Sequence, residues 1–184
     1  MTAPAIPLSV KITAASCLIP VLVLDIALCF ANNILLGGWF DPFVHGFLSL
    51  ALSLPFAFYL RPRWFWIFWG IFLSVALDID HAVAAGSIDI VKMVSMAGRP
   101  PTHSITFALV MFLIVLPINR PAAWQTLIML LAHVLRDTSS GTVPLLWPIY
   151  WQPTAPLLYW ATLPLLWWGA KKAAISDLNA GGTT

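Results

Sequence analysis

The sequence predicts an all-α fold, a polytopic membrane bundle of about six spanning helices. Hydrophobic residues make up 60% of the 184 residues, and the mean hydropathy is +0.90. Charged residues are 9% of the chain, against roughly 25% in a soluble domain. Several apolar runs reach about twenty residues, the length that crosses a hydrocarbon core about 30 Å thick. We therefore expect residues 1–184 to form one integral membrane domain in the lipid bilayer.

Six apolar stretches are separated by turn-forming or charged residues. They cover residues 12–31, 43–60, 64–85, 103–118, 122–135 and 154–170. Asparagines at 32–33 and glycines at 37–38 predict a turn after the first stretch. The fourth and fifth stretches are short enough to lie tilted or partly in the interface. Residues 138–153, rich in aromatic residues with glycine and proline, predict an interfacial or re-entrant loop, so five spans plus such a segment is the alternative. Residues 171–184 read as a short polar tail.

The charge pattern excludes one class of partner and predicts an orientation. A net charge of +2 with scattered basic residues gives no basic face for nucleic acid. Six basic residues fall on the side of the termini, namely Lys11, Arg61, Arg63, Arg120, Lys171 and Lys172. Three fall on the other side, namely Lys92, Arg99 and Arg136. The positive-inside tendency therefore predicts cytoplasmic termini, with the loops after the first, third and fifth spans facing outward.

The rare polar residues gather at the predicted outer end of the spans. All four histidines and three of the seven acidic residues, which are all aspartates, fall at this level. They are His45, Asp78, Asp80, His81, His103, His133 and Asp137. Independent placement would scatter them over both membrane faces. The pattern predicts one polar site.

Helical spacing directs these side chains toward a common centre. His133 and Asp137 stand four residues apart and Asp78 and His81 three apart, so each pair shares a helix face. Imidazole and carboxylate ligands suit a divalent metal, zinc first and manganese or iron as alternatives. We predict one or two ions, with Asp78 or Asp137 bridging a pair. The predicted metal ligands are His45, Asp78, His81, His103, His133 and Asp137.

Other polar residues have simpler interpretations. Asp80 would orient a ligand histidine or act as a general base. Asp25 lies mid-span, away from every histidine in sequence, which favours a hydrogen bond to Ser, Thr or Asn inside the bundle. Asp41 and Asp89 read as loop residues. Each histidine or aspartate taken alone is as well explained by hydrogen bonding between helices.

Donors suited to an anion surround the predicted site. Arg99, Ser104 and Thr138 offer a guanidinium fork and hydroxyl groups, the usual company of a phosphoryl site. Residues 139–141, Ser-Ser-Gly, belong to the same set. Arg99 could equally extend to the lipid headgroups. Thr102 follows two prolines and reads as a helix cap that presents the next residue, His103, on the first turn.

Four short motifs occur in the order of a known family. They are His45-Gly46, Asp78-x-Asp80-His81, Arg99-x-x-Thr102-His103-Ser104, and His133-x-x-x-Asp137 followed by Gly141 and Pro148. On these motifs, within residues 41–148, the chain resembles the YdjM-like family of LexA-regulated, membrane-bound, metal-dependent hydrolases. The resemblance implies a multi-pass protein of the bacterial inner membrane. Gly98-Arg99-Pro100 stands where that family typically has His-Arg-Gly, so one family histidine is absent here.

These observations lead to a first hypothesis of a membrane-embedded metal-dependent hydrolase acting at the outer interface. Asp80, Arg99, Ser104 and Thr138 would assist the reaction, and bound metal would lower the pKa of water from 15.7 to about 7. The site's depth favours an amphiphilic substrate, such as a phospholipid or lipid-linked phosphate, entering past Trp147 and Trp151. The alternative is a non-catalytic subunit in a complex with a membrane-protein partner, using the cluster as a structural metal site, helix brace or pigment ligand. A transporter fits least, because the inner halves of the spans carry few polar residues.

Overall fold

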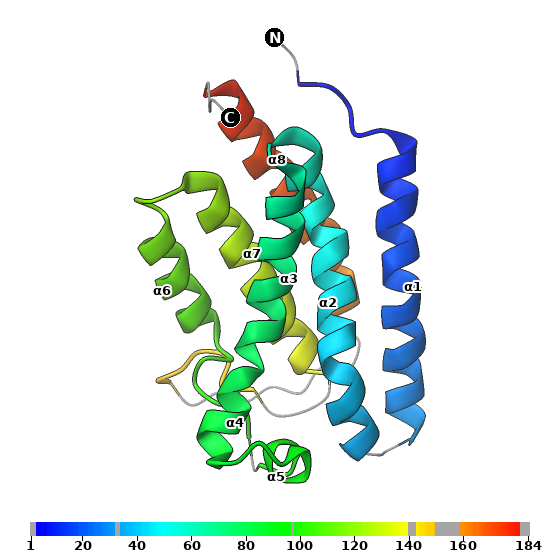
Figure 1. The fold of residues 1–184 in the computed structure, drawn as a ribbon, viewed down its shortest axis with the longest axis vertical. Coiled ribbons are helices and arrows are strands. Elements are labelled where there is room, and N and C mark those ends of the chain that lie inside the picture. The colour runs from blue at the N-terminus through cyan, green and yellow to red at the C-terminus, as the bar shows by residue number, and fades with distance from the viewer. Residues whose placement is uncertain (1–2, 32–33, 97, 140–142, 150–158, 181–184) are drawn as a thin grey trace.

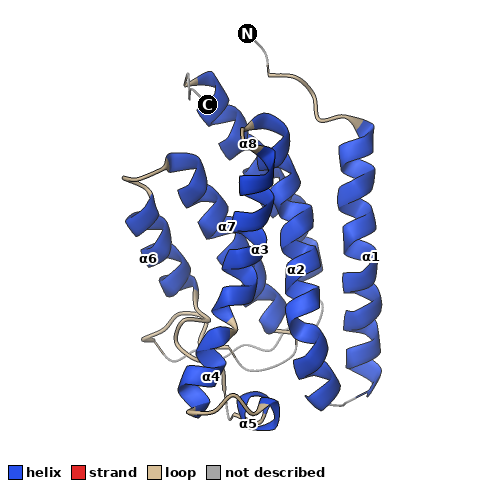
Figure 2. Ribbon diagram, in the orientation of Figure 1, coloured by secondary structure: helices blue, strands red, loops and turns tan. Residues whose placement is uncertain are grey.

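The computed structural model describes residues 3–31, 34–96, 98–139, 143–149 and 159–180, and every regular element in those ranges is helical (Figures 1 and 2). This confirms the predicted all-α class. The helices are α1 (Leu8–Ala31), α2 (Ile34–Tyr59), α3 (Arg63–Leu77), α4 (Ile79–Ala85), α5 (Ile90–Val94), α6 (Ile105–Val115), α7 (Arg120–Asp137) and α8 (Tyr159–Asn179).

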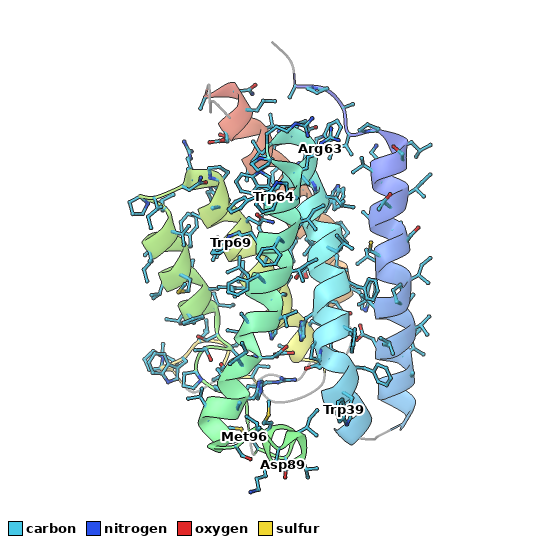
Figure 3. All side chains as sticks on the ribbon, in the orientation of Figure 1. Trp39, Arg63, Trp64, Trp69, Asp89 and Met96 are labelled. Atoms are coloured by element: carbon cyan, nitrogen blue, oxygen red, sulfur yellow. The ribbon has the colours of Figure 1, made fainter. Side chains whose placement is uncertain are left out.

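The longer helices run up and down through one bundle (Figure 1). α1 starts and α8 ends at the same end of the molecule. The short helices α4 and α5 lie at the opposite end, beside the start of α2 and the end of α7. Arg63 and Trp64 are at the first end and Asp89 is at the second (Figure 3). The alternation follows the predicted order of spans.

Three segments are long and apolar enough to cross a membrane. They are Leu8–Ala27, Trp39–Tyr59 and Arg63–Ala85, and α6 is a shorter apolar helix. Large apolar side chains along α1 are exposed, among them Ile12, Ile19 and Val23. In a chain of this hydropathy these faces contact lipid. The structure therefore supports a helical membrane bundle.

α7 is the central helix of the bundle. Most of its side chains are buried, and its backbone packs against α2, α3, α6 and α8. It has 18 residues and is capped by Asn119, whose side chain accepts a hydrogen bond from the Ala122 amide at 2.9 Å. The predicted fifth span, residues 122–135, thus lies inside the bundle. A helix that is surrounded by other helices does not need to be long enough to cross the lipid by itself.

Several boundaries differ from those predicted. Gly37 and Gly38 lie inside α2, not in a turn, because α2 begins at Ile34. The third predicted span is interrupted at Asp78, which separates α3 from α4. α8 continues through Lys171 and Lys172 to Asn179, so the predicted polar tail is largely helical. Ser104, rather than Thr102, caps α6 by accepting a hydrogen bond from the Phe107 amide at 3.0 Å.

A close contact of α3 with α2 and α7 is centred on Gly70. The Gln125 side chain donates hydrogen bonds to Ser53 Oγ at 3.1 Å and to the Trp66 carbonyl at 2.6 Å. A Cβ atom at Gly70 would lie 2.9 Å from Gln125 Nε2 and 3.3 Å from Ser53 Cβ. The three helices therefore require a residue without a side chain here.

We predict that Gly70→Ala destabilises the protein by about 1–3 kcal/mol, the usual cost of overpacking. Gly169→Ala is the matched control, because its new Cβ would meet only Ile128 Cδ1 at 3.9 Å. That substitution should be neutral or stabilising, since alanine favours a helix by up to about 1 kcal/mol. Thermal unfolding of both variants in detergent measures the difference. Equal melting temperatures would contradict this account of the packing.

Candidate metal centre

The structure brings the predicted site residues together at the end of the bundle opposite the start of α1 (Figure 1). They come from four places in the chain: the first half of α2, the junction of α3 and α4, the loop before α6, and the C-terminal end of α7. All six predicted metal ligands belong to groups whose donor atoms lie within 4.8 Å of one another. Asp41 joins one of these groups.

The centre of the cluster is a triangle of three donor atoms. Nε2 of His103 and Nε2 of His133 lie 3.2 Å apart, and each is 3.3 Å from Oδ2 of Asp137. Two ligands of a tetrahedral zinc ion bound at 2.0 to 2.1 Å lie about 3.3 to 3.4 Å apart. Two imidazole nitrogens can approach this closely only if one carries a proton toward the other or both face a cation. The triangle thus has the dimensions of one face of a metal site.

Asp78 supplies a fourth donor beside this triangle. Its Oδ1 is 3.4 Å from Nε2 of His133 and 3.8 Å from Nε2 of His103. Neither Asp78 oxygen accepts a hydrogen bond from a residue in the described ranges, although both are buried. Buried carboxylate oxygens normally have a donor or a cation. The residues therefore fit a divalent metal with His103, His133, Asp137 and Asp78 around it.

His45 lies on the other side of Asp137. Its Nε2 is 3.2 Å from Oδ1 of Asp137, the oxygen that faces away from the triangle. Its ring stacks on that of His133, with centroids 3.6 Å apart and planes 10° apart. His45 therefore holds two members of the triangle in place and offers a nitrogen on their far side.

Asp80 and His81 flank His103. Oδ2 of Asp80 lies 3.2 Å from Nδ1 of His103 and accepts a hydrogen bond from the Thr102 hydroxyl. Nδ1 of His81 lies 3.3 Å from Oδ1 of Asp80. A carboxylate at Nδ1 leaves Nε2 of the same imidazole free to face a metal. Asp80 therefore lies beside the ring nitrogen of His103 that faces away from the triangle, and its orienting role stays a prediction.

The carboxylates favour positive charge at His103, which lies in the loop before α6. Burial lowers its pKa, but the neighbouring Asp78, Asp80 and Asp137 more than offset this, so the pKa is raised above its ordinary value. Either a proton or a metal ion would supply the positive charge that these carboxylates favour at His103.

Arg99 points into the cluster rather than toward lipid headgroups. Its Nη2 is 3.4 Å from Oδ1 of Asp137 and 3.7 Å from Oδ2 of Asp41, and its Nη1 is 3.3 Å from Nε2 of His81. The guanidinium therefore lies at the Oδ1 side of Asp137, opposite the triangle. An anion-binding role for Arg99 stays a prediction.

The sequence analysis missed the roles of Asp41 and Arg136. Asp41 is not a loop residue: it lies in α2, one turn before His45, and its Oδ2 is 3.7 Å from Nε2 of that histidine. Arg136 is 1% exposed and forms an ion pair with Asp41. The i, i+4 spacing of Asp41 and His45 was a usable signal. Arg136 carried none, because helix-end arginines usually reach water or headgroups.

Asp25 does face the bundle interior, but with different partners than predicted. Arg136 donates to its Oδ1 from Nε at 3.4 Å and from Nη2 at 3.3 Å. The Tyr159 hydroxyl and the Trp160 indole, at 3.2 Å, donate to its Oδ2. Sequence distance concealed these partners, which come from α7 and α8. Asp89, read as a loop residue, caps α5 by accepting from the Val91 amide at 2.9 Å.

Two predicted hydroxyl groups have local structural partners. Ser104 caps α6, and the Thr138 hydroxyl donates to the Leu135 carbonyl at 2.7 Å. Ser139 is half-buried at the end of α7. Ser140, Gly141 and Trp151 lie outside the described residues, and Trp147 is 47% exposed.

One edge of the cluster reaches the surface. The side chains of His45, His103, His133 and Asp137 are fully buried, whereas those of Asp41, Asp78, Asp80 and Arg99 are 15–20% exposed. The triangle is thus enclosed, and the partly exposed aspartate and arginine side chains form one edge of the cluster beside it.

Charge also favours a cation in this region. Five carboxylates, Asp25, Asp41, Asp78, Asp80 and Asp137, meet two guanidinium groups, Arg99 and Arg136. With neutral imidazoles the balance is two minus five, or −3. Uncompensated buried charge is costly. One divalent ion would leave −1.

The fold and this cluster define a class: a helical membrane protein with a buried histidine–aspartate site at one end of the bundle. The chain is 28% identical over 139 residues to Transmembrane protein 267 of Danio rerio, a match that covers 70% of this chain. It spans 62% of the length of that relative. The similarity agrees with a membrane protein in a lipid bilayer. No protein-family model and no solved structure matches the chain.

Proposed function

We propose that this protein is a metal-dependent hydrolase embedded in the membrane. The observation that carries the proposal is the triangle of His103, His133 and Asp137 with its 3.2 and 3.3 Å edges. A histidine that only braces helices needs one hydrogen-bond partner for each of its two ring nitrogens. Three donor atoms at ligand spacing, with Asp78 beside them, exceed that need. The ordered motifs shared with the YdjM-like family support the same chemistry.

We assign one divalent ion, zinc before manganese or iron, to His103, His133 and Asp137, with Asp78 beside it. Catalytic zinc has three protein ligands and keeps its fourth position open for water, and Asp78 would lie next to that position. The group formed by Asp41, His45 and Asp137 does not need a second ion. Arg99 and Arg136 already supply its positive charge, with Arg99 3.4 Å from Asp137 and Arg136 paired with Asp41.

The residues around the ion would have different roles in hydrolysis. When bound, a divalent metal supplies an activated water at neutral pH and Lewis-acid stabilisation of negative oxygen. Asp80 keeps His103 in the tautomer that presents Nε2 and, being 20% exposed, can also accept a proton from water. Arg99 offers a guanidinium fork to a phosphoryl or acyl oxygen. Ser104 and Thr138 would support the helix ends rather than the reaction.

The substrate we propose is amphiphilic, a phospholipid or a lipid-linked phosphate. The accessible edge of the cluster is at one end of the bundle, where headgroups lie if the long helices span the membrane. Trp147, exposed on the loop at that end, suits an interface. Arg99 at the edge matches a phosphate in charge and geometry.

Metal content is the first test. We expect about one divalent ion per chain by plasma mass spectrometry of detergent-purified protein, and none in His133→Ala. Asp89→Asn is the matched control: it removes an acidic residue at the same end of the bundle, and asparagine caps a helix as well as aspartate. It should keep the ion. A wild-type protein without metal would reject the hydrolase and favour the non-catalytic subunit.

Arg99→Lys should separate metal binding from activity. An ammonium group keeps the charge but cannot reproduce the two-pronged contact of guanidinium. We expect unchanged metal content and a loss of about 10²–10³-fold in turnover, the range for removing one oxyanion donor. Release of phosphate from lipid phosphates in mixed micelles provides the assay. Full turnover in Arg99→Lys would remove this residue from the reaction.

We further propose an inner-membrane location, with both termini cytoplasmic and the site outside. The basic residues at the starts of α1, α3 and α7 lie at the end of the bundle opposite the site (Figure 1). In a background without native cysteines, Ile88→Cys should react with an impermeant thiol reagent on intact cells, because Ile88 is 93% exposed beside α4. Ser176→Cys, exposed near the other end, should react only after lysis. The reverse pattern would invert the orientation.

A further inference from the structure

Asp25 is the one acidic residue of the membrane-crossing stretch of α1, and its side chain is only 4% exposed. A carboxylate at this depth is costly unless it is satisfied. Four donor atoms satisfy it: Nε and Nη2 of Arg136, the Tyr159 hydroxyl and the Trp160 indole. α1 packs its backbone on α2 among the described helices, so this side chain links it to α7 and α8.

The two sides of the Arg136 guanidinium contact different carboxylates. Nε and Nη2 are held by Asp25, while Nη1 pairs with Asp41 and lies 3.5 Å from Nε2 of His45. Nη1 is also 3.9 Å from Oδ1 of Asp137. A guanidinium is planar, so fixing one side fixes the direction of the other. Without Asp25, the Arg136 guanidinium could turn toward Asp137 and compete with a metal ion for its carboxylate.

From this geometry we infer that Asp25 is a positioning residue for the metal centre, acting through Arg136. The carboxylate holds the guanidinium so that Nη1 fixes Asp41 and His45 at the Oδ1 side of Asp137. Oδ2 of Asp137 then remains directed at His103 and His133. The inference rests on the proposed function for its effect on metal, but the position of His45 is a property of the protein alone.

Asp25→Asn tests this inference, because the amide keeps the shape of the side chain and removes its charge. We measure zinc affinity by competition with a chelator, and the imidazole ¹⁵N resonance of His45 in metal-free, ¹⁵N-histidine-labelled protein, assigned with His45→Gln. We expect about tenfold weaker zinc binding, at the lower end of the range for outer partners of metal ligands. The His45 resonance should shift in the absence of zinc.

Gln125→Met is the control for a purely structural effect. Gln125 is also buried in α7 and joins it to α2 and α3, but lies three turns before Arg136, about 16 Å along the helix. This variant should lower the melting temperature while zinc affinity and the His45 resonance stay at their wild-type values. A structural role for Asp25 alone would give the same pattern in Asp25→Asn.

Tyr159→Phe keeps the inference testable if Asp25→Asn does not fold. It removes one donor from Asp25 while the carboxylate and Arg136 remain, so the same His45 resonance should shift by a smaller amount. An unchanged resonance in the folded variant would overturn the inference, whether or not the wild type binds zinc. A wild type that binds no zinc, with a shifted resonance, would reject the hydrolase and retain the positioning role.

Discussion

The burial of Asp137 is the constraint on which this structure depends. Its carboxylate is fully buried at the end of the central helix, and its two oxygens face different partners. Oδ2 faces His103 and His133, whereas Oδ1 faces His45 and Arg99. Because an uncompensated carboxylate inside a membrane protein is costly, these partners must come together from α2, from α7 itself and from the loop before α6. The bundle is built to bring them to one point.

The two sides of Asp137 suggest two chemical tasks. Nitrogen donors at ligand spacing lie on one side, and guanidinium groups lie on the other. A metal ion on the first side and an anionic group near the second would be adjacent without competing for the same oxygen. In the proposed arrangement, Arg99 and Arg136 supply the positive charge on the Oδ1 side of Asp137.

The buried polar network extends from the site to the C-terminal third of α1. Arg136 carries the connection, since it touches Asp41 at the cluster and Asp25 in the membrane-crossing stretch. α1 is otherwise largely lipid-facing, and its single buried carboxylate is better explained by a task at the site than by packing. A helix remote in sequence from every histidine can thus influence the centre.

The sequence by itself determined the helical membrane class, the order of the spans and the level at which the polar residues lie, because hydropathy and i, i+3 or i, i+4 spacing are local properties. Residues of the cluster such as His133 and Asp137 could be named for that reason. The tertiary structure alone decided that Asp41 belongs to the cluster, that Ser104 and Thr138 serve helix ends, and that Arg136 faces inward. Those outcomes depend on which helices become neighbours, and residues 111 positions apart, such as Asp25 and Arg136, leave no periodic trace of their contact.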